Sequence, residues 1–112
     1  MQEKGGSEEA AEALARYSRF VADLRQGVLE GPGQADPAMR RAAATGEGVA
    51  EPWQSYTSKV RNEPWSVADS DIGDLKAAGH SEDEIFEMTI AAALGPSLRI
   101  LDAGLQAVRD AG

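Results

Sequence analysis

Three side chains in this sequence could move protons at a reaction centre: Glu51, Asp71 and His80. His80 is the only histidine, and imidazole is the side chain whose unperturbed pKa lies nearest neutrality. A carboxylate can act as a general base, and it can act as an acid where burial raises its pKa. These three residues are therefore the candidate catalytic residues. For His80, the alternative is a turn residue just past the end of a helix.

A serine nucleophile would need His80 beside it and a carboxylate behind it. Ser66 or Ser81 could attack, and Asp71 or Asp74 could orient the ring. Neither serine lies in a nucleophile-elbow sequence, so the support for nucleophilic catalysis is weak.

Aromatic side chains surround the break expected at Pro64: Trp53, Tyr56 and Trp65. They are candidates for lining a small pocket. The alternative is packing in the core, which is the commoner role of large aromatic residues.

The segment 62–87 holds eight acidic residues against Lys76 alone. Such a run is typical of a solvated face, and an interaction surface for a basic partner is the alternative. A calcium loop starting at Asp69 is rejected, because Gly73 and Asp74 are swapped relative to that pattern and the twelfth position is His80. We expect no metal site.

Nucleic acid is not an expected partner. The sequence pI is about 4.5. Residues 69–90 read as helix, turn and helix, but the first turn of the second helix would carry Glu82, Asp83 and Glu84 into a groove lined by phosphates.

The elements that position these residues are all predicted to be helices, five or six in number. Residues 1–6 read as a flexible leader, and residues 7–112 as a single helical domain. Capping residues, apolar spacing and helix breakers predict the helices. They start at Ser7, Asp36-Pro37, Glu51-Pro52, about Asp69 and Ser81, and end near Gly31, Gly46, Asn62, Gly79 and Asp110.

Apolar spacing within the long helices predicts buried faces. Leu14, Tyr17, Val21, Leu24 and Val28 form one stripe, as a core face or a subunit contact. Gly95-Pro96 should kink or split the last helix. Ala92 and Ala93 would allow a close subunit contact, and Arg40 and Arg41 are expected to face solvent.

Composition points to an oligomer. The chain has 112 residues, and Leu, Ile, Val and Phe together number only 20 of them, beside 20 alanines and a net charge of −8. So few large apolar side chains give one subunit little core, and pairing between subunits would enlarge it. We therefore expect a homo-oligomer.

Several classes are excluded. There is no run of 18 apolar residues and no signal peptide, so we expect no membrane partner and a cytoplasmic location. The absence of cysteine excludes disulfides, thiolate catalysis and iron–sulfur ligation. No cofactor is expected.

Residues 78–87, followed by Ala91 to Gly95, resemble the carboxymuconolactone decarboxylase and alkylhydroperoxidase-D-like family. Pieces further upstream, within residues 20–44 and 67–75, also look like its short cysteine-free members. The resemblance covers residues 17–110. It implies an all-helical fold that assembles into trimers, hexamers or other oligomers.

The redox branch of that family uses Glu, then Cys-x-x-Cys, then His. Counted back from the Gly79 turn, the cysteine positions fall on Pro64 and Val67, the histidine position falls on Asp71, and the glutamate position lies one residue from Glu51. Thiol-dependent peroxide reduction is therefore excluded. The resemblance leaves a small-molecule-binding or assembly role. A cysteine-independent lactone decarboxylase-like enzyme and an acidic interaction module are the alternatives.

Overall fold

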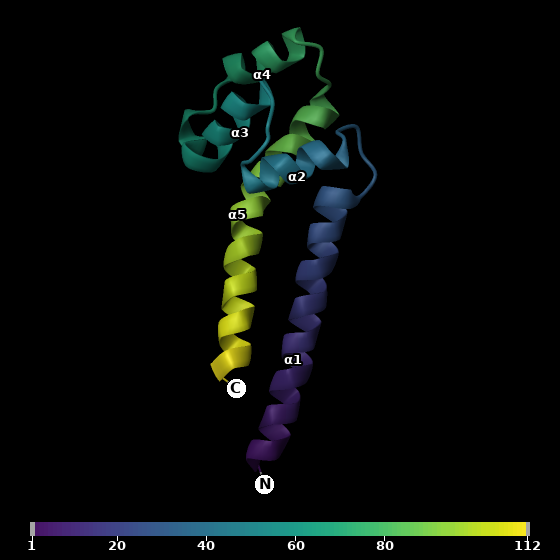
Figure 1. Ribbon diagram of the computed structural model, residues 1–112, viewed down its shortest axis with the longest axis vertical. Coiled ribbons are helices and arrows are strands. Elements are labelled where there is room, and N and C mark those ends of the chain that lie inside the picture. Colours follow the sequence, from purple (N-terminus) through teal and green to yellow (C-terminus); the bar gives the residue numbers. More distant parts are fainter. Residues whose placement is uncertain (1, 112) are drawn as a thin grey trace.

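The computed structural model describes the backbone of residues 2–111 and the side chains of residues 8–111. Within these residues the chain is all-helical, as predicted (Figure 1). Five α-helices form: α1 (Gln2–Arg25), α2 (Pro37–Thr45), α3 (Trp53–Asn62), α4 (Asp69–Ala77) and α5 (Glu82–Ala111). A π-helical turn, Gln26–Glu30, follows α1, and a 3-10 turn, Pro64–Ser66, follows α3.

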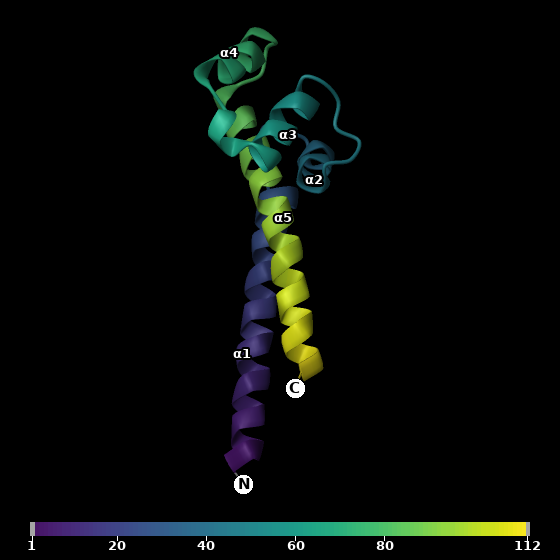
Figure 2. The same cartoon turned by 90° about the vertical axis from the view of Figure 1, so that its left-hand side faces the viewer.

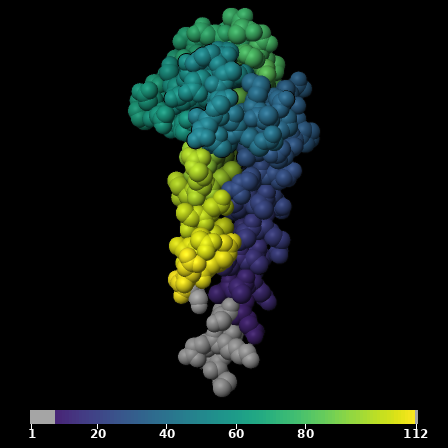
Figure 3. All heavy atoms as spheres, in the orientation of Figure 1, coloured from purple at the N-terminus to yellow at the C-terminus, as the bar shows by residue number. Residues whose placement is uncertain are grey.

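The helices form a stalk and a head. The stalk is an antiparallel pair made by α1 and the C-terminal half of α5 (Figures 1 and 2). The head contains α2, α3, α4 and the N-terminal half of α5, and it is broader than the stalk in Figure 3. The molecule measures 65 × 27 × 23 Å, with a radius of gyration of 17.8 Å. A globular domain of this length would have a radius of gyration of about 13 Å, so the chain is elongated.

The start of α1 differs from the sequence expectation. The helix begins at Gln2, within the segment 1–6 that reads as a leader. Met1 and the predicted cap of Ser7 lie outside the described backbone and side chains, respectively. At its other end, α1 passes into the π-helical turn and the helical backbone stops at Gly31, where the Gly-Pro-Gly sequence predicts a break.

The ends of the other helices follow the capping signals. The Asp36 carboxylate accepts a hydrogen bond from Ala38 N at 2.8 Å, and Gly46 ends α2 with a φ of 81°. Gly79 follows α4 with a φ of 99°. Ser81 Oγ accepts a bond from Glu84 N at 3.1 Å and caps α5. These bonds satisfy backbone groups that a helix terminus would otherwise leave unpaired.

The core lies in the head. Its largest fully buried side chains are Trp53, Thr57, Leu75 and Met88. Trp53, Tyr56 and Val60 lie together on the buried side of α3, so Trp53 and Tyr56 pack in the core, which was the alternative to a purely pocket-lining role. The stalk buries much less, and among the described side chains of α1 the buried one is Val21. The chain therefore has a compact head on a thinly packed stalk.

The last helix is continuous through Gly95-Pro96, so of the two expected outcomes, a kink or a split, the split does not occur. Gly95 lies against the end of α2, where an added Cβ would be only 2.0 Å from the carbonyl oxygen of Ala44. Glycine is thus required for the crossing of α2 and α5. Ala92 is fully buried within the chain's own core and Ala93 is exposed, which corrects the expectation that both face a neighbour.

Arg40 corrects another expectation, because its side chain is buried and not solvent-facing. Its guanidinium donates from Nη1 to the carbonyl of Val28 at 3.0 Å and from Nη2 to that of Gly31 at 2.5 Å. Val28 lies in the last helical turn and Gly31 is the residue that ends it, where no further amide follows in the helix to pair with these carbonyls. Arg41 is exposed, as expected, and pairs with Glu30.

Glu87 fastens the loop between Gly31 and Asp36 to α5. Its carboxylate accepts hydrogen bonds from Gln34 N at 3.0 Å and from Ala35 N at 2.8 Å. Partial burial would raise the pKa of Glu87, but the amides of Ala35 and Gln34 and the charge of Arg40 outweigh it and lower the pKa. The charged form of Glu87 therefore stabilises the fold.

This bond set predicts an acid dependence of stability. The pKa of Glu87 is lower in the folded chain than in the unfolded chain, so its contribution is complete above the unfolded-state value and is lost as the pH falls through the folded-state value. Urea unfolding between pH 3 and pH 7 should show that Glu87→Gln lowers stability at neutral pH and flattens the acid limb. Parallel curves for the two proteins would contradict this.

No helix within the described residues is long and apolar enough to cross a membrane.

Candidate functional site

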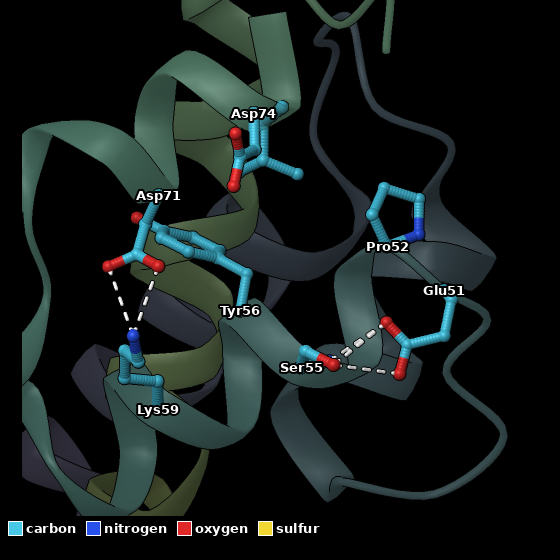
Figure 4. Close-up of a pocket in the computed structure, with 8 residues that line it drawn as sticks. Glu51, Pro52, Ser55, Tyr56, Lys59, Asp71 and Asp74 are labelled. Carbon is cyan, nitrogen blue, oxygen red and sulfur yellow. Dashed lines mark hydrogen bonds and ion pairs between the residues drawn. The ribbon is translucent and has the colours of Figure 1, made fainter. Parts of the chain in front are cut away.

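A cavity of about 270 Å³ opens between α3, α4 and the turn that precedes α3 (Figure 4). We call it the α3–α4 cavity. Two of the three candidate catalytic residues, Glu51 and Asp71, line it, although 19 positions separate them in the sequence. Its full lining is Glu51, Pro52, Ser55, Tyr56, Lys59, Asp71, Asp74 and Leu75.

Glu51 lies at the start of α3. Its carboxylate accepts hydrogen bonds from Ser55 Oγ, at 2.9 and 3.0 Å, and from Ser55 N at 3.3 Å. These bonds satisfy an amide in the first turn of α3 and hold the carboxylate at the cavity wall (Figure 4). Glu51 is exposed, so solvent or a ligand can reach its remaining lone pairs.

Asp71 and Lys59 form an ion pair across the cavity from Glu51, with Tyr56 between the two pairs in Figure 4. Lys59 Nζ lies 3.0 Å from Oδ1 and 3.2 Å from Oδ2 of Asp71. The Asp71 carboxylate also accepts a bond from Ala68 N at 2.8 Å, which caps α4. The Ala68 amide, followed by the Lys59 ammonium, lowers the pKa of Asp71. At neutral pH this residue is a carboxylate.

Tyr56 is buried and forms part of the cavity wall with its ring. Its hydroxyl is hydrogen-bonded to Thr89 Oγ1 at 2.7 Å, on the side of α5. Pro52 and Leu75 add apolar surface, and Asp74 adds a further carboxylate. The cavity therefore combines an apolar floor with polar groups at several points of its rim, which is typical of a small-molecule site.

The other candidates lie elsewhere. His80 is outside the α3–α4 cavity; its Nδ1 lies 2.9 Å from Glu84 Oε1, and its ring lies against that of Trp53 with centroids 4.6 Å apart and the two planes tilted by 51°. Trp53 is in the core. Trp65 is 80% exposed and does not line the cavity. The structure thus brings together Glu51, Asp71 and Tyr56, and it separates His80 from them.

The sequence did not single out Lys59 or Ser55, and it singled out Asp74 only as a possible partner of His80. One signal was available, because Glu51, Ser55 and Lys59 follow each other at intervals of four and so share one face of a helix. The pairing of that face with Asp71 depends on the packing of α4, which no local pattern reveals. Among the described residues, no group of three or more acids or histidines has the geometry of a metal site.

Comparison with family models, with curated proteins and with solved structures finds no match for this chain.

Proposed function

We propose that this protein binds a small molecule in the α3–α4 cavity as a subunit of a homo-oligomer, and that it is a cysteine-free relative of the carboxymuconolactone decarboxylase and alkylhydroperoxidase-D-like family. The observation that carries the binding role is the meeting of Glu51 and Asp71 in one cavity. The family resemblance aligns its glutamate position next to Glu51 and its histidine position with Asp71. Their shared cavity supports the resemblance.

Binding is favoured over the alternative of a lactone decarboxylase-like enzyme. That reaction needs a proton donor at the developing carbanion. Asp71 is held as a carboxylate by Ala68 and Lys59, and the Tyr56 hydroxyl is bonded to Thr89. His80 lies outside the cavity. These placements leave Glu51 as the remaining candidate for the proton donor. Glu51 is exposed to solvent, whereas a carboxyl group that donates a proton at neutral pH is typically buried.

Binding is also favoured over an acidic interaction module. Four of the eight acids in residues 62–87 are engaged within the subunit: Asp71 with Lys59, Glu82 with Lys76, Glu84 with His80, and Glu87 with the amides of the loop. The acidic segment therefore stabilises the head in large part and offers less free negative charge than its sequence suggests.

The homo-oligomer is supported by apolar side chains that the subunit leaves exposed. From Phe86 onward, one side of α5 carries no charge over its whole length. Phe86 is 64% exposed and Ile100 is 73% exposed. The residues of this uncharged face are Phe86, Thr89, Ile90, Ala93, Ser97, Ile100, Leu101, Gly104, Ala107, Val108 and Ala111. Surfaces of this kind are typical of protein contacts.

Separate measurements test the assembly and the binding site. Light scattering should give a mass above that of one 11.8 kDa subunit. In a thermal-shift screen of small metabolites, compounds that bind the native state should raise the melting temperature. Titration calorimetry with those compounds should show at least about tenfold weaker binding to Glu51→Gln and to Lys59→Met.

Glu47→Gln is the matched control, because Glu47 is exposed on the head and does not line the cavity. It should bind the same compounds as tightly as the wild type. A screen without a stabilising compound, or compounds that bind all four proteins equally, would refute the binding site. A monomer at micromolar concentration would refute the assembly.

A further inference from the structure

The exposed side of α1 carries two large aromatic side chains that the rest of the chain does not cover. Tyr17 is 57% exposed and Phe20 is 65% exposed, while Val21 is buried against the stalk. Large apolar residues that lie three positions apart are neighbours on one face of a helix, and such a face is usually covered in the assembled protein. The stalk of one subunit leaves both of them open to solvent.

A flank of charged residues runs beside these two aromatic side chains. Each residue of an α-helix is rotated by about 100° from the one before. Ala13, Tyr17 and Leu24 therefore lie within about 60° of Phe20 on one side. On the other side, within about 100° of Phe20, lie five charged residues, all exposed: Glu9, Glu12, Arg16, Arg19 and Asp23.

The order of charges along this flank is asymmetric. Glu9 and Glu12 come first, and Arg16 and Arg19 follow. Within the described part of the chain, none of these four residues forms an ion pair. The Arg16 guanidinium lies over the ring of Tyr17, 5.9 Å from its centroid. The part of the flank with Glu9 and Glu12 is thus negative, the part with Arg16 and Arg19 is positive, and Asp23 follows at the end nearest the head.

We propose that α1 pairs with α1 of a second copy of this chain, antiparallel and about a twofold axis near Leu14. This inference rests on the proposed homo-oligomer and names its interface. Antiparallel pairing places the same flank of the two helices side by side. Glu12 then lies opposite Arg16 of the partner subunit, and Glu9 lies opposite Arg19 of the partner subunit. The twofold axis repeats both pairs.

The same register fits the apolar side chains. It places Tyr17 between Ala10 and Ala13 of the partner subunit, so that a large residue meets small ones, which is the arrangement that close helix packing requires. Parallel pairing in register would instead place the charged flanks of the two helices on opposite sides of the contact, where Glu9 and Glu12 would face no arginine of the partner subunit. An anionic lipid surface would attract Arg16 and repel Glu12.

Charge-reversal variants test the pairing. Arg16→Glu/Arg19→Glu makes the flank acidic, and Glu9→Lys/Glu12→Lys makes it basic. In sedimentation velocity at about 0.1 M salt, each should associate at least about tenfold more weakly than the wild type, because all four ion pairs become repulsive. An equimolar mixture should form a heterodimer, and the variant carrying all four changes should recover wild-type association.

Glu47→Lys/Glu63→Lys is the control for Glu9→Lys/Glu12→Lys, because it makes the same change of net charge at exposed positions of the head. It should associate like the wild type. Circular dichroism of each variant checks that the helices form. A wild-type monomer would refute both the proposed homo-oligomer and this interface. A wild-type oligomer that both flank variants leave unchanged, or a mixture without a heterodimer, would refute the α1 pairing alone.

Discussion

Gly95→Ala should destabilise the head by at least about 2 kcal/mol, although alanine is the better helix former. The new Cβ would lie 2.0 Å from the carbonyl oxygen of Ala44 and 2.6 Å from its carbonyl carbon. Both atoms are backbone, so no change of rotamer can relieve the overlap. The helices α2 and α5 must move apart, and the contacts of Ala43 and Ala92 at their crossing are lost with them. Urea unfolding monitored by circular dichroism gives the free energy directly.

Gly73→Ala provides the matched control. Gly73 also lies within a helix, α4, but no atom lies within 4 Å of the position that its Cβ would occupy. The same substitution should therefore be neutral or stabilise the protein by up to about 1 kcal/mol, through helix propensity alone. Equal effects of the two substitutions would show that the crossing of α2 and α5 is not as close as described.

Arg40→Met should cost about 2–4 kcal/mol of unfolding free energy. Methionine preserves much of the length and apolar volume of the side chain, so the loss reports the guanidinium. Without it, the carbonyls of Val28 and Gly31 lose their buried donor. The positive charge that helps to lower the pKa of Glu87 also disappears. The acid limb of the stability curve should therefore move to higher pH in this variant.

Arg41→Met separates this effect from the general loss of a positive charge. Arg41 is adjacent in the sequence, and its ion pair with Glu30 is exposed. Exposed pairs of this kind contribute less than about 1 kcal/mol. Unfolding curves of the two variants, recorded side by side, should therefore differ clearly. If Arg40→Met were as mild as Arg41→Met, the bonds to Val28 and Gly31 would not stabilise the loop.

The fold was predictable where local chemistry decides it. Asp36, Gly46 and Gly79 set the ends of helices through bonds or backbone angles within a few residues, and α2, α3 and α4 begin and end close to the expected positions. The expectation that Arg40 faces solvent was wrong because its hydrogen-bond partners lie 9 and 12 residues away, in a turn whose course the sequence does not define. The division into stalk and head likewise depends on contacts between the first and last helices.

Part of the candidate site was also predictable, because residue type and the family resemblance point to some of its residues. Glu51 and Asp71 were selected by residue type and by the resemblance, and the packing of α3 against α4 brings them together. His80 was selected because it is the sole histidine, but its position beside Trp53 follows from the tertiary fold. Lys59 was missed because a lysine on an exposed helix face becomes informative only when the position of Asp71 is known.

The unbroken course of α5 has a mechanical consequence. The helix is anchored by Gly95 against α2, and the 16 residues beyond it extend for about 24 Å. A rotation of α5 by about 10° at the contact of Gly95 with α2 would displace the C-terminal end of the helix by about 4 Å, because the displacement grows with the distance from the contact. Small rearrangements where α5 crosses α2 are thus amplified along the stalk. Gly95 thus divides α5 into an N-terminal part that packs in the head and a C-terminal part that forms one side of the stalk and ends at Ala111.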